Sequence, residues 1–145
     1  MKQRFFALLC LLGLSLSALA DAPHLPLQIG LFRIDAEVVA DQPSRMQGLM
    51  YRQSMPQHQG MLFVFDRLDR HCMWMRNTLL PLAVAFIDES GKILNVEEML
   101  PQTENNHCAA APARFALEMN KGWFASKKIK PGTVIKGLDK APPPR

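Results

Sequence analysis

Several polar side chains lie inside otherwise apolar stretches of the sequence, and together they could bind a small molecule. Arg45 and Arg52 are seven residues apart, which puts them on one face of a helix if a helix runs that far. Asn77 and Thr78 end one apolar segment, and Glu118 lies within another. If these groups converge on a cleft, the arginines would bind a carboxylate or phosphate through paired hydrogen bonds, and the others would bind hydroxyl groups. The alternative is that the arginines and Glu118 form structural ion pairs and that Asn77 caps a turn.

The sequence carries no familiar catalytic signature. It has no G-x-S-x-G, no H-E-x-x-H, no phosphate-binding glycine loop and no C-x-x-C. We therefore predict a binding or accessory module rather than an enzyme, with no cofactor and with a small polar or anionic ligand. A small periplasmic hydrolase or lyase that uses Glu118 as its acid or base is the first alternative.

Methionine and histidine suggest a second alternative, a periplasmic Cu(I) carrier. His71, Met73 and Met75 alternate along one segment, so the two thioethers would lie on one face of a strand. Thioether and imidazole ligands suit Cu(I), which is a soft ion. Methionine is also a common filler of apolar cores. Core packing is therefore the simpler interpretation, and we predict no other metal site.

The first twenty residues have the pattern of a signal peptide. Lys2 and Arg4 precede an apolar run over residues 5–16, and Ala18-Leu19-Ala20 forms a small-x-small cleavage site. The apolar run is shorter than the roughly 20 residues that a membrane-spanning helix needs. We therefore expect cleavage after residue 20 and a periplasmic or secreted mature chain.

Export also decides how the cysteines are interpreted. Cys72 and Cys108 remain in the mature chain, in a compartment that permits disulfides. A bridge between them would stabilise the fold by about 3–4 kcal/mol in the chain-entropy model. A zinc site with the neighbouring His71 and His107 is disfavoured, because adjacent residues of a strand point to opposite faces.

The charge balance of the mature chain is modest. Loss of Lys2 and Arg4 lowers the formal charge from +4 to about +2. This value gives no reason to expect nucleic acid as a partner, and contact with a membrane is expected only during export. The oligomeric state cannot be derived from these features.

The elements that must position the candidate site are short strands. Short apolar runs bounded by Pro, Gly and Asp favour strands over helices. We expect strands at 27–34, 36–40, 60–65, 72–80, 82–88, 92–99, 114–120 and 133–135. We expect helical turns at 44–51, with Met46, Leu49 and Met50 towards the core, and at 122–128; 101–112 is expected as a loop.

This pattern predicts a mainly β fold: a single-domain β-sandwich or partly closed β-barrel with one or two short helices. An α+β layer with a longer helix around Arg45 is the alternative. The expected organisation is a flexible leader at 21–26, one domain at 27–138 and a disordered tail at 139–145.

Four motifs in order carry a family resemblance. They are R-x-x-G-L-M-x-R at 45–52, G-M-L-F-x-F at 60–65, W-M-[KR]-N-T-x-x-P-L at 74–82 and L-E-x-N-x-G at 117–122. From about residue 38 to 135 the chain resembles the domain of unknown function 192 family. The resemblance implies a compact, mainly β domain, often exported, with no established activity. Members often have Asp after the Pro-Leu pair, where this sequence has Ala83, so a role that depends on that carboxylate is not expected here.

Overall fold

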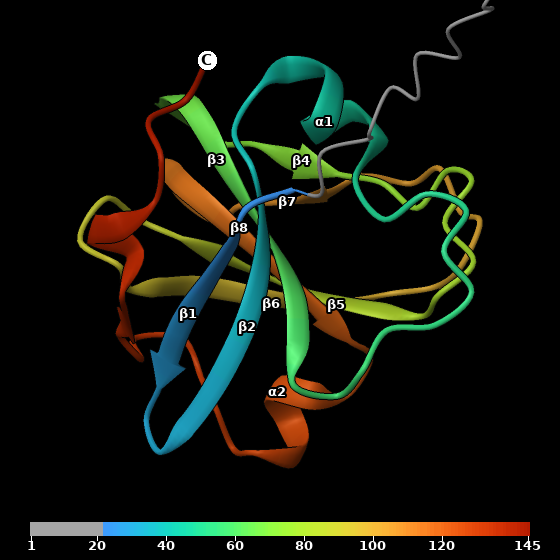
Figure 1. The fold of residues 1–145 in the computed structure, drawn as a ribbon. Helices are drawn as coiled ribbons and strands as arrows, with labels where there is room; N and C mark the ends of the chain where they lie inside the picture. Colours follow the sequence, from blue (N-terminus) through green and yellow to red (C-terminus); the bar gives the residue numbers. More distant parts are fainter. Residues whose placement is uncertain (1–21) are drawn as a thin grey trace, which may run out of the picture.

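The computed structural model describes residues 22–145, so the predicted signal peptide lies outside the described part of the chain. Seven strands form one curled sheet in the order β6-β5-β8-β3-β2-β1-β9 (Figure 1). These strands are β1 (His24–Ile29), β2 (Phe32–Val39), β3 (Gln59–Asp69), β5 (Leu82–Ile87), β6 (Ile93–Met99), β8 (Ala113–Asn120) and β9 (Ile135–Lys136). A second, two-stranded sheet joins β4 (Cys72–Met73) to β7 (His107–Cys108). The helices α1 (Gln42–Gln47) and α2 (Trp123–Ser126) and a 3-10 turn, Leu138–Lys140, complete the fold.

The curled sheet nearly closes on itself. Its two edge strands meet where Lys92 and Val134 form an isolated antiparallel bridge. Beside this bridge, the Ile93 amide donates to the Thr133 carbonyl at 2.9 Å and the Ile135 amide donates to the Gly91 carbonyl at 2.8 Å. The contacts leave few unpaired groups at that end of the sheet. The prediction of a mainly β, partly closed barrel is therefore confirmed.

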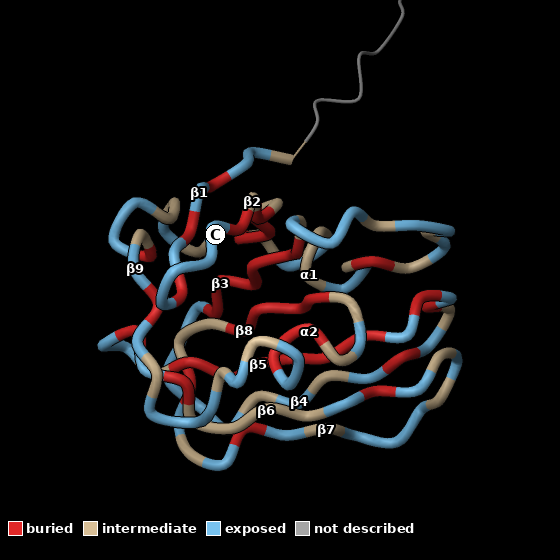
Figure 2. The backbone as a smooth tube through the Cα atoms, turned by 90° about the horizontal axis from the view of Figure 1, so that it is seen from below, coloured by how far each residue is buried: buried red, intermediate tan, exposed pale blue. Residues whose placement is uncertain are grey.

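The central strands are buried on both faces. Along β8, Leu117 belongs to the core inside the barrel, whereas its neighbour Ala116 belongs to a second core on the outer face. Loops between β2 and β3 and around the β4–β7 sheet cover that outer face. Figure 2 shows the result as buried backbone along β3, β5 and β8. Residues 116–119 of β8 are all buried, so this part of the strand has no solvent-facing side.

The first hairpin differs from the expected one. Its turn lies at Gly30 and Leu31 and not between the strands expected at 27–34 and 36–40, because Gly30 adopts the left-handed conformation (φ +57°) that the tight turn requires. β1 begins at His24, so part of the expected leader pairs with β2. Pro26 is tolerated there because β9 pairs only with the last two residues of β1, which leaves the proline at an open edge.

The helix that follows β2 is shorter than predicted. Asp41 caps it, its carboxylate accepting the Ser44 amide at 2.9 Å, and Pro43 lies in the first turn. Gly48 ends it with φ +49°. Leu49 is buried as expected, but Met46 is 59% exposed.

Three further segments were assigned wrongly. β3 continues to Asp69 instead of ending at Phe65, because it keeps pairing with β8 beyond a bulge. The strand expected over 72–80 ends at Met73, and Asn77 (φ +52°) turns the chain away from an extended path. The loop expected over 101–112 contains β7.

Candidate functional site

The loops outside the barrel enclose a cleft against the outer face of β3 and β8. Its volume is about 230 Å³, and its walls come from α1 and the turn after it, from β3, and from the segment around β4. Most of the lining is apolar: Leu49, Met50, Phe63, Phe65, Met73 and Trp74. The ionisable side chains of the lining are Arg45, Asp66, His71 and Glu118. A mostly apolar cleft with a few polar groups is typical of small-molecule sites.

Glu118 is the unusual member of this lining. It lies on β8 opposite Met61 of β3 and Val84 of β5, and only 4% of the residue is exposed. Within residues 22–145, no hydrogen bond or ion pair reaches its carboxyl group, while every fully buried side-chain polar atom there has a partner. The Glu118 carboxyl must therefore keep contact with the open space of the cleft. Burial raises its pKa from 4.5 to about 8, because the charged form loses its hydration.

Arg45 supplies the positive charge of the cleft. Its Nη1 donates to the Ala40 carbonyl at 2.6 Å and to the Val64 carbonyl at 3.0 Å, which ties α1 to the end of β2 and to the middle of β3. Among the described residues no carboxylate lies within ion-pair distance of its guanidinium. The remaining N–H groups of Arg45 are therefore available to an acceptor in the cleft.

His71 and Thr78 line the cleft, and each side chain also makes contacts within the protein. The His71 ring stacks on Phe65 with centroids 3.8 Å apart, and its Nε2 lies 2.9 Å from the Arg67 carbonyl. A carbonyl only accepts, so Nε2 carries a proton and Nδ1 carries the lone pair when the ring is neutral. The Thr78 hydroxyl donates to the Arg76 carbonyl at 3.1 Å.

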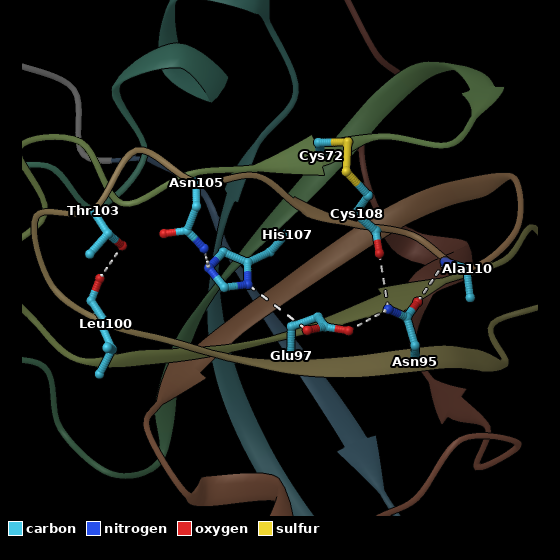
Figure 3. A network of polar contacts seen from close by, with 9 residues as sticks. All are labelled: Cys72, Asn95, Glu97, Leu100, Thr103, Asn105, His107, Cys108 and Ala110. Atoms are coloured by element: carbon cyan, nitrogen blue, oxygen red, sulfur yellow. Dashed lines mark hydrogen bonds and ion pairs between the residues drawn. A yellow bond between two sulfur atoms is a disulfide. The ribbon is translucent and has the colours of Figure 1, made fainter.

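The predicted disulfide is present and forms part of the cleft wall. Cys72 of β4 and Cys108 of β7 are bonded to each other, 36 residues apart in sequence. Figure 3 shows how Asn95 of β6 holds this unit: its Nδ2 donates to the Cys108 carbonyl at 3.0 Å, and its Oδ1 accepts the Ala110 amide at 2.9 Å. Because both sulfurs are consumed in the bond, they are not zinc ligands in this state.

The five predicted site residues divide into two groups. Arg45, Thr78 and Glu118 line the cleft. Arg52 instead forms a two-pronged ion pair with Glu37 on β2, with Nη2 to Oε2 at 2.6 Å, and Asn77 lies outside the lining. Arg52 lowers the pKa of Glu37 by hydrogen bonding to its charged form. Arg52 does not share a helix face with Arg45 because the helix ends before it.

The three copper candidates are also separated. His71 and Met73 line the cleft, but Met75 is fully buried in the outer core. The strand that would have put both thioethers on one face is too short. In the part of the chain that the structure describes, no three His, Cys, Asp or Glu side chains are grouped so that they could hold a metal ion.

Sequence reasoning missed the apolar lining of the cleft. Three lining residues belong to the first two family motifs: Leu49 to the motif at 45–52, and Phe63 and Phe65 to the motif at 60–65. In the sequence they are indistinguishable from ordinary core residues. The signal available in the sequence was Trp74, a large aromatic residue in the third family motif; the structure leaves 37% of it exposed at the cleft. None of the helices within residues 22–145 has the length and apolar character needed to span a membrane.

Comparisons with known proteins place these features in a family. The chain is similar to a protein of unknown function from Novosphingobium aromaticivorans DSM 12444, with 28% identity, a TM-score of 0.77, and coverage of 82% of this chain and 89% of that one. It is also similar to a protein from Sinorhizobium meliloti 1021, named as a candidate transcription regulator, with 34% identity, a TM-score of 0.72, and coverage of 79% and 92%. A comparison with curated protein sequences found no match. The family model described as "Uncharacterized ACR" matches residues 27–137, and the chain therefore belongs to the domain of unknown function 192 family, DUF192.

Proposed function

We propose that this protein is an exported binding module that holds a small ligand in the cleft beside Glu118. The ligand has a mostly apolar body, which packs against the aromatic and methionine side chains, and a carboxylate head. The observation that supports this proposal most strongly is the buried carboxyl group of Glu118, which faces the cleft without a protein partner. An unpartnered buried polar group weakens the fold, and such groups are typical of sites that serve a ligand.

The charge of the ligand head follows from the two polar groups that are free to meet it. With a pKa of about 8, Glu118 is protonated at neutral pH and can donate a hydrogen bond to an anionic oxygen. Arg45 adds further N–H donors and a positive charge. Asp66 also lines the cleft, but its side chain is exposed, where water and salt screen its repulsion.

Three probes that share a six-carbon skeleton and differ in their polar group test this proposal: hexanoate, hexanol and hexylamine. We expect hexanoate to bind most tightly at neutral pH, and to shift the amide resonances of residues around Trp74 and Glu118. Above about pH 8 its affinity should fall, because ionised Glu118 repels a carboxylate. In the Glu118→Gln variant the affinity at neutral pH should persist and the decline above about pH 8 should disappear.

A matched control separates this effect from a general change of charge. Glu89→Gln alters an exposed glutamate in the turn after β5 and should leave the pH dependence as in the wild type. Tighter binding of hexylamine than hexanoate, with an affinity that rises above about pH 8, would mean that the cleft selects cations and would refute the anionic head.

A second candidate function uses the same carboxyl group as an acid or base catalyst. A buried carboxyl group with a pKa near neutrality, in a cleft beside His71, is suited to proton transfer. The test is hydrolysis of 4-nitrophenyl hexanoate as a function of pH. Turnover that disappears in Glu118→Gln and changes near pH 8 would favour the enzyme, whereas equal rates in both proteins would exclude this role for Glu118 in ester hydrolysis.

The exported location is part of the proposal. It depends on the signal-peptide pattern of residues 1–20 and is compatible with the Cys72–Cys108 disulfide, since such bonds persist mainly in oxidising compartments. Fractionation of expressing cells, with the mass of the mature chain, tests it. A chain that begins at Asp21 in the exported fraction is expected, and an uncleaved chain in the cytosol would contradict it.

A further inference from the structure

The turn between β1 and β2 exposes apolar side chains at the end of the barrel opposite α1. Leu31 is 95% exposed and Phe32 is 37% exposed. The turn projects because Gly30 takes φ +57° and β1 and β2 remain paired up to Ile29 and Phe32. A leucine that leaves nearly all of its surface in water contributes nothing to the stability of the barrel. Together with Phe32 it forms an exposed apolar patch at the tip of the hairpin.

Aromatic and basic side chains gather beside this turn. Phe32 packs edge-to-face on Trp123 of α2 with ring centroids 6.1 Å apart. The Lys127 ammonium lies 5.0 Å from the Phe32 ring and 5.2 Å from the Trp123 ring, within the range of cation–π contacts. Figure 1 shows the turn and α2 at the same end of the molecule. Arg33, Gln57 and His58 also line the shallow groove there.

The surrounding sequence is basic. Between Glu118 and Asp139 there is no acidic residue, and the segment holds five lysines, of which Lys121, Lys128 and Lys130 are exposed close to α2 in sequence. Lys127 is the lysine of this segment whose ammonium contacts the Phe32 ring of the apolar turn. Two acidic groups lie near this surface: Glu98 of β6, whose carboxylate accepts the Gly122 amide at 3.1 Å, and Asp35 of β2, whose amide donates to the carbonyl of His58 in the groove at 2.9 Å. The positive charges of Lys127 and Arg33 therefore lie on one surface with the exposed apolar side chains.

We propose that this end of the barrel docks on a membrane surface that carries anionic lipid headgroups. Leu31 and Phe32 enter the boundary between headgroups and acyl chains, and Arg33 and the lysines contact the lipid phosphates. Leucine, aromatic rings and Lys or Arg in one patch are the combination that interfacial binding uses. Nucleic acid would bind the positive charges through its phosphates. It would give Leu31 no apolar environment, because the sugar–phosphate backbone is polar and hydrated. The docking surface is separate from the cleft, so it does not depend on the proposed ligand.

Co-sedimentation of the mature chain with vesicles tests the proposal. Vesicles of phosphatidylglycerol and phosphatidylcholine should bind the protein, less so at high salt, and vesicles of phosphatidylcholine alone should bind it weakly. Leu31→Ser should weaken binding roughly tenfold, as expected for an apolar side chain that leaves the interface. Lys127→Gln should weaken it roughly fivefold, the usual effect of one basic residue at an anionic surface.

The matched control is Leu68→Ser, because Leu68 is an exposed leucine near the far end of β3. It should bind vesicles as the wild type does. Since Leu31 has almost no contact with the barrel, Leu31→Ser should unfold at the wild-type temperature, which excludes misfolding as the cause of lost binding. Equal vesicle binding by Leu31→Ser and wild type would overturn the proposal. So would binding to a short DNA duplex, weakened by Lys127→Gln, in a protein that ignores both kinds of vesicle.

Discussion

The buried carboxyl group of Glu118 makes a quantitative prediction about stability. Its pKa is about 8 in the folded protein and 4.5 as an ordinary side chain, so the folded state holds a proton that the unfolded state has already released between these values. The free energy of unfolding therefore falls as pH rises through this window. At 1.36 kcal/mol for each unit of pKa, the difference of about 3.5 corresponds to about 5 kcal/mol lost between pH 4.5 and pH 8.

The variant Glu118→Gln isolates this contribution, because glutamine keeps the shape and does not ionise. Near pH 4.5 the wild type should be about as stable as the variant, and its relative stability should then fall by about 1.4 kcal/mol for each pH unit. Glu37, Asp41 and Asp88 have lowered pKa values, so their contributions are lost only as pH falls below the ordinary range and cancel in the comparison.

The assay is unfolding by guanidinium chloride at several pH values, followed by tryptophan fluorescence with the disulfide intact. A carbon-13 titration of the glutamate side chains would report the pKa of Glu118 directly. Arg45, Asp66 and His71 line the same cleft, and movement of Arg45 towards the ionised carboxylate would reduce the slope. Parallel stability curves for wild type and variant between about pH 5 and 8 would refute the reasoning.

Three further predictions concern the frame around the cleft. Reduction of the Cys72–Cys108 bond, or its replacement in a double serine variant, should lower the free energy of unfolding by about 4 kcal/mol, measured with and without reductant; an unchanged value in the reduced protein would contradict the chain-entropy argument. Arg52→Gln should destabilise by about 1–3 kcal/mol at neutral pH by leaving Glu37 unpaired. The loss should shrink as pH falls below 4.5 and through the lowered pKa of Glu37, and a loss that does not change with pH would have another cause. Gly60→Ala should destabilise by about 1–3 kcal/mol, because the new Cβ would lie 2.5 Å from the backbone carbonyl of Glu118; a variant with wild-type unfolding would show that β8 yields easily.

Strand positions could be predicted where the signal is local. Pro81 precedes the start of β5, and the turn in which the Asp88 carboxylate accepts the amides of Ser90 and Lys92 separates the end of β5 from the start of β6. Short strands with weak borders were less predictable. Met73 and Met75 were expected on one strand, but the chain turns after β4 because its extended pairing is limited to two residues of β7.

The residue types of the candidate site could be predicted, but only some of the predicted residues line the cleft. Arg45 and Glu118 are polar residues within apolar motifs, which made them candidates, and both line the cleft. Arg52 matched the same criterion but pairs with Glu37, a residue on a strand whose neighbours in space come from distant parts of the chain. An ion-pair partner that is fifteen residues away in sequence leaves no local pattern to recognise.

The sequence by itself determined the family motifs, the mainly β class and the pairing of Cys72 with Cys108, because composition, period and cysteine count are local or countable properties. Only the tertiary structure decided that Glu118 is buried, that Arg45 has no carboxylate partner within residues 22–145, and that Leu31 is exposed at the end of the barrel. Burial of a polar group depends on which loops cover a strand. That cover is assembled from segments far apart in the chain, so the chemistry of the cleft arises from long-range packing.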